Sequence, residues 1–303
     1  MIRISYIKNM KYKKRIILNI GGFYISVNFG PSGLDYEKGL LYDQILSHYR
    51  NFITLSAQQS IRRIITIVDE RNFNVIARKS VRYTSFYIKK SNNIITFYNI
   101  SLSQFTLLIL TILQELLGKS GFILHASGVI ILDKAYLFTG ASGSGKSTLA
   151  HIMSSDYKQI SDDSVIIRKE GGGFFAYQTP MIEKNINKFV RDRTRYKIAA
   201  IFFLKKTGYL SHKSIANPAD ACVHLIEQVW VAQNYTRRLF SLLSLLSSQI
   251  TIYELSFPKK NQVINYVFNI SKTLNRNPGE ENKDMKKPDR NKQPAGYRQT
   301  QFV

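Results

Sequence analysis

The feature that most constrains the fold is a glycine-rich stretch near the middle of the chain. It consists of Gly140, Ala141, Ser142, Gly143, Ser144, Gly145, Lys146, Ser147 and Thr148. The glycines let the backbone turn tightly, so that successive N–H groups can point inward around a phosphate. The lysine offers a positive charge to the terminal phosphates, and the serine after it is the usual magnesium ligand. The stretch therefore predicts a phosphate loop, or P-loop.

The residues on either side supply the local structure that a P-loop needs. Residues 134–139 are a short apolar run bounded by turn residues, which predicts a strand. Residues 147–153 carry apolar side chains at helical spacing, which predicts a helix whose N-terminal dipole attracts an anion. Strand, glycine turn and helix in this order are the context that the motif requires, so the chain is expected to bind a nucleoside triphosphate.

Composition narrows the class of protein further. The chain has 303 residues, 44% of them hydrophobic, and can bury a substantial core in one or two domains. A single cysteine, Cys222, excludes internal disulfides and predicts a cytoplasmic location. The net charge is +23, yet the basic residues are scattered apart from residues 11–15, so no nucleic-acid partner is expected. No apolar run reaches the roughly 18 residues that a membrane span needs, so no span is predicted.

The order of the expected elements divides the chain into four parts. Residues 1–100 read as strands separated by turn residues, which predicts a small antiparallel sheet with a structural or docking role. Residues 101–119 predict a linking helix that begins at a serine cap and ends at Gly118. Residues 120–274 hold the P-loop domain, and the polar residues 275–303 predict a disordered tail.

The individual elements follow from apolar patterns and from the turn residues between them. Strands are expected at 15–20, 23–29, 64–69, 81–88, 94–98, 122–125, 129–132, 135–138, 159–160, 165–167, 198–204 and 250–255. Helices are expected at 218–235, 238–247 and 260–274, and a hairpin turn at 171–173. Residues 184–197 read as a basic stretch that contains a loop.

Three further side chains are candidates for the chemistry. Asp162 and Asp163 follow Lys146 by 16 and 17 residues, at the end of the next expected strand. A magnesium-bound triphosphate needs a carboxylate there, and a second carboxylate could accept a proton from an attacking hydroxyl. The alternative is a pair of turn residues whose side chains lie in solvent. His125 ends a strand that could run beside the P-loop strand, where it could reach a phosphate, orient a carboxylate or serve as a buried structural histidine.

Together these motifs resemble a known family. Residues 124–126, the P-loop at 140–147 and the step at 161–163 are similar, in order and spacing, to the catalytic domain of bacterial HPr kinase/phosphorylase. That domain is related in fold to ATP-dependent phosphoenolpyruvate carboxykinase. The resemblance is clear over residues 122–168, weaker from there to about residue 273, and does not include residues 1–100. The layout is more similar still to the HPr-kinase-like proteins of peptide-biosynthesis clusters.

The resemblance implies a role for each matching residue. Residues 140–148 would cradle ATP, and Ser147 and Asp163 would hold Mg2+. Asp162 would be the general base toward a serine hydroxyl, and His125 would lie near the transferred phosphate. The chain departs from the family after residue 168. Only Glu183 and the arginines at 191, 193 and 195 correspond loosely to the family's glutamate signature and arginine loop.

The expected function is therefore a magnesium-ATP-dependent kinase that phosphorylates a hydroxyl, serine above all, of a peptide, a protein or a small molecule. The alternative is a nucleotide-binding accessory or switch protein of a biosynthetic cluster, with little or no phosphotransfer. The acceptor, the donor (ATP, another triphosphate or pyrophosphate) and homo-oligomer formation stay open. The expected fold class is α/β, with an HPr-kinase-like P-loop domain after a small, mostly-β N-terminal region.

Overall fold

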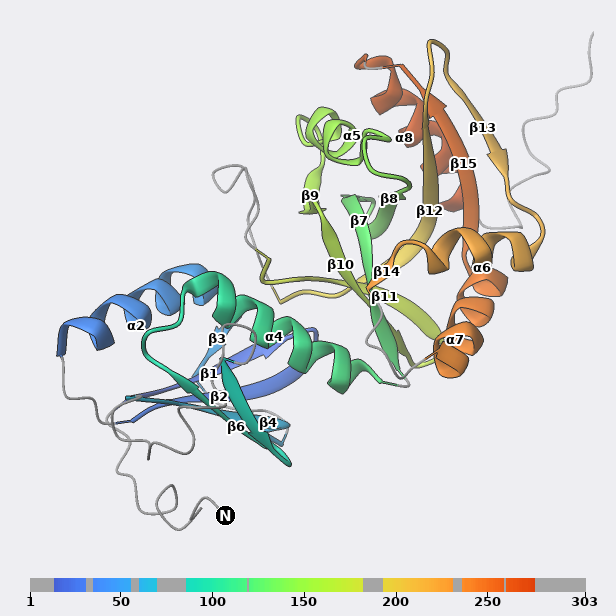
Figure 1. Ribbon diagram of the computed structural model, residues 1–303. Helices are drawn as coiled ribbons and strands as arrows, with labels where there is room; N and C mark the ends of the chain where they lie inside the picture. Colours follow the sequence, from blue (N-terminus) through green and yellow to red (C-terminus); the bar gives the residue numbers. More distant parts are fainter. Residues whose placement is uncertain are drawn as a thin grey trace, which may run out of the picture.

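Two β-sheets and six α-helices make up the part of the chain that the computed structural model describes (Figure 1). The described residues are 14–30, 35–55, 60–69, 86–118, 120–181, 193–230, 236–258 and 260–275. The fold is mixed α/β, as the sequence predicts. Among the described helices, none is both long enough and apolar enough to cross a membrane.

The first sheet has the strand order β3-β1-β2-β4-β6-β5 and mixes parallel with antiparallel pairs. Its elements and those around it are β1 (Lys14–Ile20), β2 (Phe23–Phe29), α2 (Asp35–Tyr49), the 3-10 helix η1 (Arg50–Phe52), β3 (Ile53–Thr54), β4 (Arg63–Val68), β5 (Tyr87–Lys90) and β6 (Asn93–Phe97). The prediction of an antiparallel sheet is wrong, because β2 pairs with β4, and β4 with β6, in parallel. Parallel neighbours need a crossover connection, and α2 lies on the one from β2 to β4.

Helix α2 is absent from the predicted elements, although Leu41, Ile45 and Tyr49 recur at helical spacing and are buried in the core. Most of the expected strands in this region are confirmed within a residue or two at each end. The exception is the strand expected at 81–88: β5 begins at Tyr87, and residues 81–85 lie outside the described part of the chain.

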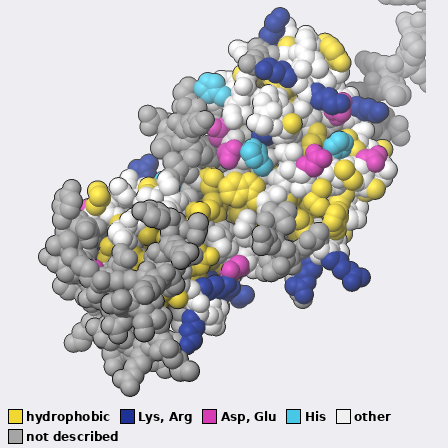
Figure 2. All heavy atoms as spheres, in the orientation of Figure 1, with side chains coloured by type: hydrophobic (Ala, Val, Ile, Leu, Met, Phe, Trp, Pro, Cys, Tyr) yellow, Lys and Arg dark blue, Asp and Glu magenta, His cyan; other side chains and the backbone are white. Residues whose placement is uncertain are grey.

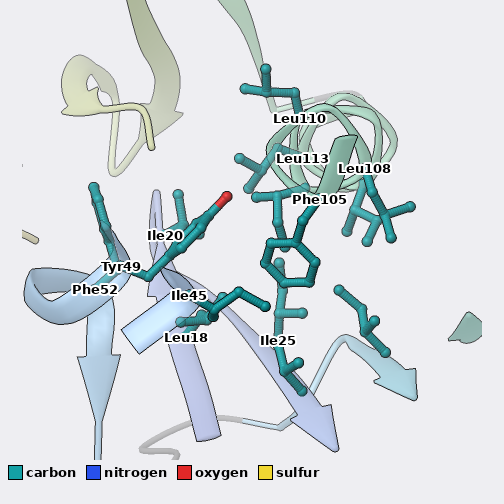
Figure 3. Packing of buried hydrophobic residues seen from close by; sticks show 14 of the residues in the cluster. Leu18, Ile20, Ile25, Ile45, Tyr49, Phe52, Phe105, Leu108, Leu110 and Leu113 are labelled. Atoms are coloured by element: carbon teal, nitrogen blue, oxygen red, sulfur yellow. The ribbon is translucent and has the colours of Figure 1, made fainter. Parts of the chain in front are cut away.

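Helix α4 (Leu102–Leu117) confirms that a helix is present between residue 101 and Gly118, and it packs on the first sheet. Its N-terminus is a capping box: Ser101 Oγ accepts from the Gln104 N–H at 3.2 Å, and Gln104 Oε1 accepts from the Ser101 N–H at 2.9 Å. Gly118 ends it in a positive-φ conformation, as predicted. Figure 3 shows Phe105 and Leu113 of this helix pointing toward strand residues of the sheet, with Tyr49 of α2 beside them.

The second sheet contains the glycine-rich stretch and has the strand order β11-β10-β7-β8-β12-β15-β13. Its elements are β7 (Gly121–Ile131), β8 (Lys134–Thr139), α5 (Lys146–Met153), β9 (Lys158–Ser161), β10 (Ser164–Glu170), β11 (Gly173–Gln178), β12 (Tyr196–Lys206), β13 (Ser211–Ser214), α6 (Pro218–Ile226), β14 (Val229–Trp230), α7 (Thr236–Gln249), β15 (Thr251–Phe257) and α8 (Gln262–Asn275). Strands β8, β12 and β15 are parallel, so their carboxyl ends meet at one edge. Helices α5 and α8 pack on one face of these strands, and α6 and α7 on the other.

Two expectations in this half are corrected. The two strands expected at 122–125 and 129–132 are one long strand, β7. Gly128 looks like a turn residue in the sequence, but a Cβ there would lie 2.8 Å from Leu137 Cδ2, so the glycine allows close packing inside the strand. The helix expected at 218–235 ends at Ile226 and is followed by β14, while residues 231–235 lie outside the described part. The hairpin turn at Gly171 is confirmed between antiparallel β10 and β11.

The N-terminal unit (β1 to α4) shares one apolar cluster with the second sheet. Ile123, Ile166 and Tyr177 of β7, β10 and β11 are buried in the same cluster as the side chains of α4. Polar contacts join the two parts as well: the Arg168 guanidinium donates to the carbonyl of Gly21. The division of the chain into the predicted domains stays a prediction, and residues 276–303 of the predicted tail lie outside the described part.

Removal of a buried side chain from α4 should lower the free energy of unfolding. Leu113 is completely buried, so Leu113→Ala is expected to cost about 2–5 kcal/mol, the range for a leucine deleted from a packed core. Leu107 of the same helix is 51% exposed, and Leu107→Ala should change stability by less than about 0.5 kcal/mol. Urea unfolding of both variants followed by circular dichroism measures the difference. Equal losses of unfolding free energy in the two variants would show that α4 does not bury Leu113 and expose Leu107.

Candidate functional site

The glycine-rich loop (residues 140–145) connects the end of β8 to the start of α5, the connection that the motif predicts. Gly140, Gly143 and Gly145 all have positive φ, at 139°, 77° and 101°. Side chains rarely tolerate this conformation, so glycine is required where the loop turns. The Ser144 N–H donates to the Ala141 carbonyl at 3.1 Å, which closes the turn.

Contacts with neighbouring strands hold this loop in place. A Cβ on Gly145 would lie 2.8 Å from Cζ of Phe257, the last residue of β15. A Cβ on Gly140 would lie 3.3 Å from the carbonyl oxygen of Leu204 in β12. The loop therefore lies against the carboxyl ends of the parallel strands, the edge at which open α/β sheets bind their ligands.

Lys146, the first residue of α5, is folded back over the loop. Its Nζ donates to the carbonyl oxygens of Gly140 at 2.8 Å and Ala141 at 3.2 Å, and its side chain is buried. Burial lowers the pKa of this ammonium group, and the negative charge of Asp163 acts in the opposite direction. A partly desolvated cation beside the loop interacts strongly with an anion, because water screens it less.

The acidic pair lies in the turn between β9 and β10, as predicted. The buried hydroxyl of Ser161 shapes this turn: its Oγ accepts from the N–H groups of Asp163 at 3.2 Å and Ser164 at 2.9 Å. It donates in turn to the carbonyl of Ser164 at 2.6 Å. The side chains of Asp162 and Asp163 are both partly exposed, so they can meet a ligand.

The structure brings His125 and Asp163 together. Nε2 of His125 lies 3.4 Å from Oδ1 of Asp163, and the two side chains are 38% and 47% exposed. The backbone supports this pairing, because the Ala126 N–H donates to the Asp163 carbonyl at 3.1 Å. The carbonyl of His125 accepts from the buried hydroxyl of Thr139, the last residue of β8. Figure 2 shows histidine and acidic side chains next to each other near the middle of the visible face.

Strand β7 places the histidine between two packed regions. Side chains alternate along a strand, so Ile123, His125 and Ser127 share one face. Ile123 is buried against the N-terminal unit, and Ser127 is buried under α5, where its hydroxyl donates to the Lys146 carbonyl at 2.9 Å. The partly exposed histidine lies between them. Sequence reasoning missed Ser127 because the expected strand ended at residue 125, whereas β7 continues through the serine.

The structure describes two of the four remaining candidates from the sequence, Arg193 and Arg195. Arg195 pairs with Glu170, which lies at the far end of β10 from the acidic turn. Arg193 is exposed, and Glu183 and Arg191 lie outside the described part of the chain.

A metal ion would have few protein ligands here. Among the residues that the structure describes, no group of three or more His, Cys, Asp or Glu side chains gathers at a potential metal site. The exposed Ser147 in the first turn of α5 and the partly exposed Asp163 offer two oxygen ligands. Such a set fits magnesium, which is often held by one or two protein oxygens together with substrate phosphates and water.

Comparison with known proteins places the chain in a family. A search of curated proteins finds no match. Among solved structures, the HPr(Ser) kinase/phosphatase from Coxiella burnetii is similar at 11% identity and a TM-score of 0.30, over 50% of this chain and 94% of that one. A likeness this low establishes no activity. The family model of SynChlorMet cassette protein ScmC matches residues 92–253, which is more than half of the chain and includes His125, the glycine-rich loop and the acidic turn. The chain therefore belongs to the ScmC family of SynChlorMet cassette proteins.

Proposed function

We propose that this chain is a kinase that uses magnesium-bound ATP to phosphorylate a hydroxyl group of a peptide, a protein or a small molecule. The observation that carries the proposal is the meeting of the acidic turn, His125 and the glycine-rich loop along β7. Asp163 contacts His125 at 3.4 Å, and Ser127, two residues on, is bonded to the first residue of α5. A phosphate site next to carboxylates and an imidazole is the set of groups that phosphoryl transfer needs.

The triphosphate would bind at residues 140–148. The N–H groups of the loop and of the first turn of α5, with the helix dipole behind them, favour a negative charge at this position. Lys146 would exchange its bonds to the two loop carbonyls for bonds to phosphate oxygens. Because the loop glycines already have the required backbone conformation, little ordering would accompany binding.

Ser147 and Asp163 would hold the magnesium ion, and the ion would neutralise the charge of the phosphates. Asp162 is then the base that accepts the proton of the acceptor hydroxyl. The hydroxyl oxygen forms a bond to the γ-phosphorus while the bond from that phosphorus to the ADP oxygen breaks. His125, oriented by Asp163, would lie near the transferred group and stabilise its negative charge.

Lys146→Ala should weaken ATP binding sharply. A charge-assisted bond to phosphate contributes about 1.5–3 kcal/mol, so the dissociation constant should rise roughly tenfold to 150-fold. Lys272→Ala removes an exposed lysine from α8 and should leave the affinity unchanged. Calorimetric titration with ATP and magnesium measures all three proteins. Equal affinities of the wild type and Lys146→Ala would contradict the assignment of the nucleotide site.

The two aspartates should differ in their effects. Asp162→Asn keeps the shape of the turn but removes the proton acceptor, so phosphotransfer should fall by about 100-fold to 10,000-fold while ATP stays bound. Asp163→Asn weakens a metal ligand and should first raise the magnesium concentration needed for half-maximal rate. Asp220→Asn, in the first turn of α6, is the matched control.

Single-turnover transfer from γ-labelled ATP, across a magnesium series, separates these effects. Transfer by Asp162→Asn at the wild-type rate would show that another group accepts the proton. If the wild type binds ATP and transfers nothing to any acceptor, the chain is an accessory protein and the kinase proposal fails.

A further inference from the structure

Trp230, the one tryptophan of the chain, lies on the same face of the sheet as the candidate reaction centre. It is the last residue of β14 and pairs with Ile123 of β7. Paired residues on neighbouring strands point to the same face, and residues two apart along a strand do so too. Trp230 is therefore the diagonal neighbour of His125, and such neighbours have Cα atoms roughly 7–8 Å apart, within reach of an aromatic side chain.

Contacts on both sides fix the position of β14. The His125 N–H donates to the Gln228 carbonyl at 2.7 Å, just before the strand. Gln114 of α4 lies 3.5 Å from the Trp230 carbonyl oxygen. The indole is only partly buried and packs against the apolar cluster of the N-terminal unit. A large apolar side chain is thus held at a fixed place beside the histidine, with part of its surface open.

Two polar side chains of the described N-terminal unit, His48 and Gln114, face the second sheet and already have hydrogen-bond partners. Nε2 of His48, near the end of α2, donates to the Pro180 carbonyl at 2.7 Å. The amide of Gln114 faces the carbonyl of Trp230. A polyol or sugar would need directional polar groups around each hydroxyl. The surface beside His125 instead offers an aromatic ring, which suits an apolar group of the acceptor.

The separation expected for diagonal strand neighbours, roughly 7–8 Å, is close to the separation of alternate residues in an extended peptide. Residues two apart in an extended chain lie on one side, about 6.6 Å from each other. A serine or threonine hydroxyl at the His125 and Asp163 end would therefore place the side chain two positions away near the indole. On the face that Figure 2 shows, hydrophobic side chains lie next to histidine and acidic side chains.

We propose, on the basis of the kinase function above, that the acceptor is a peptide segment whose phosphorylated serine or threonine has a large apolar residue two positions away, and that Trp230 binds this residue. Trp230 is a specificity-determining residue and takes no part in the transfer itself.

Three acetylated, amidated heptapeptides test the spacing. One has leucine at both positions two away from the serine (GLGSGLG), one has asparagine there (GNGSGNG), and one has leucine next to the serine (GGLSLGG). Because Trp230 is the sole tryptophan, its fluorescence in the full chain, with magnesium and a non-hydrolysable ATP analogue, reports peptide binding without any transfer. The first peptide should change the emission and saturate at concentrations about tenfold lower than the others, the gain that burial of one leucine gives.

Substitutions of Trp230 test whether the indole binds the apolar residue of the peptide. Trp230→Ala should raise the KM for GLGSGLG about tenfold with ATP affinity unchanged, and Trp230→Phe should recover most of the loss because an aromatic surface returns. Phe240→Ala is the matched control, since this aromatic side chain is 44% exposed on α7, which packs on the opposite face of the sheet.

The outcomes separate this proposal from the kinase proposal. Equal binding of the three peptides, no change in emission with any of them, or a wild-type KM for Trp230→Ala would each overturn the role of Trp230. Equal transfer to all three peptides, or to free serine, would keep the kinase and overturn the acceptor surface. Selective binding of GLGSGLG without transfer would keep the acceptor surface and overturn the kinase.

Discussion

The alternation of side chains along β7 is the constraint on which the rest of the candidate site depends. A strand can present only every second residue to one face, so Ile123, His125 and Ser127 occupy three consecutive places there. Each place meets a different part of the molecule: the apolar cluster of the N-terminal unit, the carboxylate of Asp163, and the first residue of α5. A shift of one residue in the register would turn all three away together. The site and the core are therefore specified by the same strand.

Buried hydroxyl groups hold the acidic turn in place through hydrogen bonds. Ser161 accepts two N–H groups of the turn, and Ser164 bonds to Thr179 through their hydroxyls at 2.8 Å. The next residue, Pro180, accepts a hydrogen bond from His48 of α2. Because these hydroxyl groups are buried and their bonds would be costly to leave unmade, they limit the conformations open to the turn. The positions of the two carboxylates thus depend on hydrogen bonds from the second sheet and from helix α2 of the N-terminal unit.

Local patterns predict much of this structure, and non-local pairings account for most of what they miss. The β8–loop–α5 connection, the serine cap of α4 and the acidic turn depend on neighbouring residues, and all three appear where the sequence indicates. The parallel pairing of β2 with β4 and the continuity of β7 depend on partners far along the chain. The partners of Trp230 and Ser127 also come from distant segments, so no local pattern could point to them. The sequence alone therefore predicts the glycine-rich motif but not the residues that pack around it.

The hairpin between β1 and β2 has a consequence for how such chains can diverge. Arg168 donates to the carbonyl of Gly21 and lies over the ring of Phe23. A Cβ atom added to Gly22 would lie only 2.5 Å from a guanidinium nitrogen of Arg168. Any side chain at that glycine would displace the arginine from the backbone it recognises. The N-terminal unit therefore contacts Arg168 of the second sheet through a turn made of two glycines, neither of which can take a side chain without strain. Recombination that exchanges one half for a foreign sequence would have to bring the matching turn or arginine with it, so the halves should be inherited together.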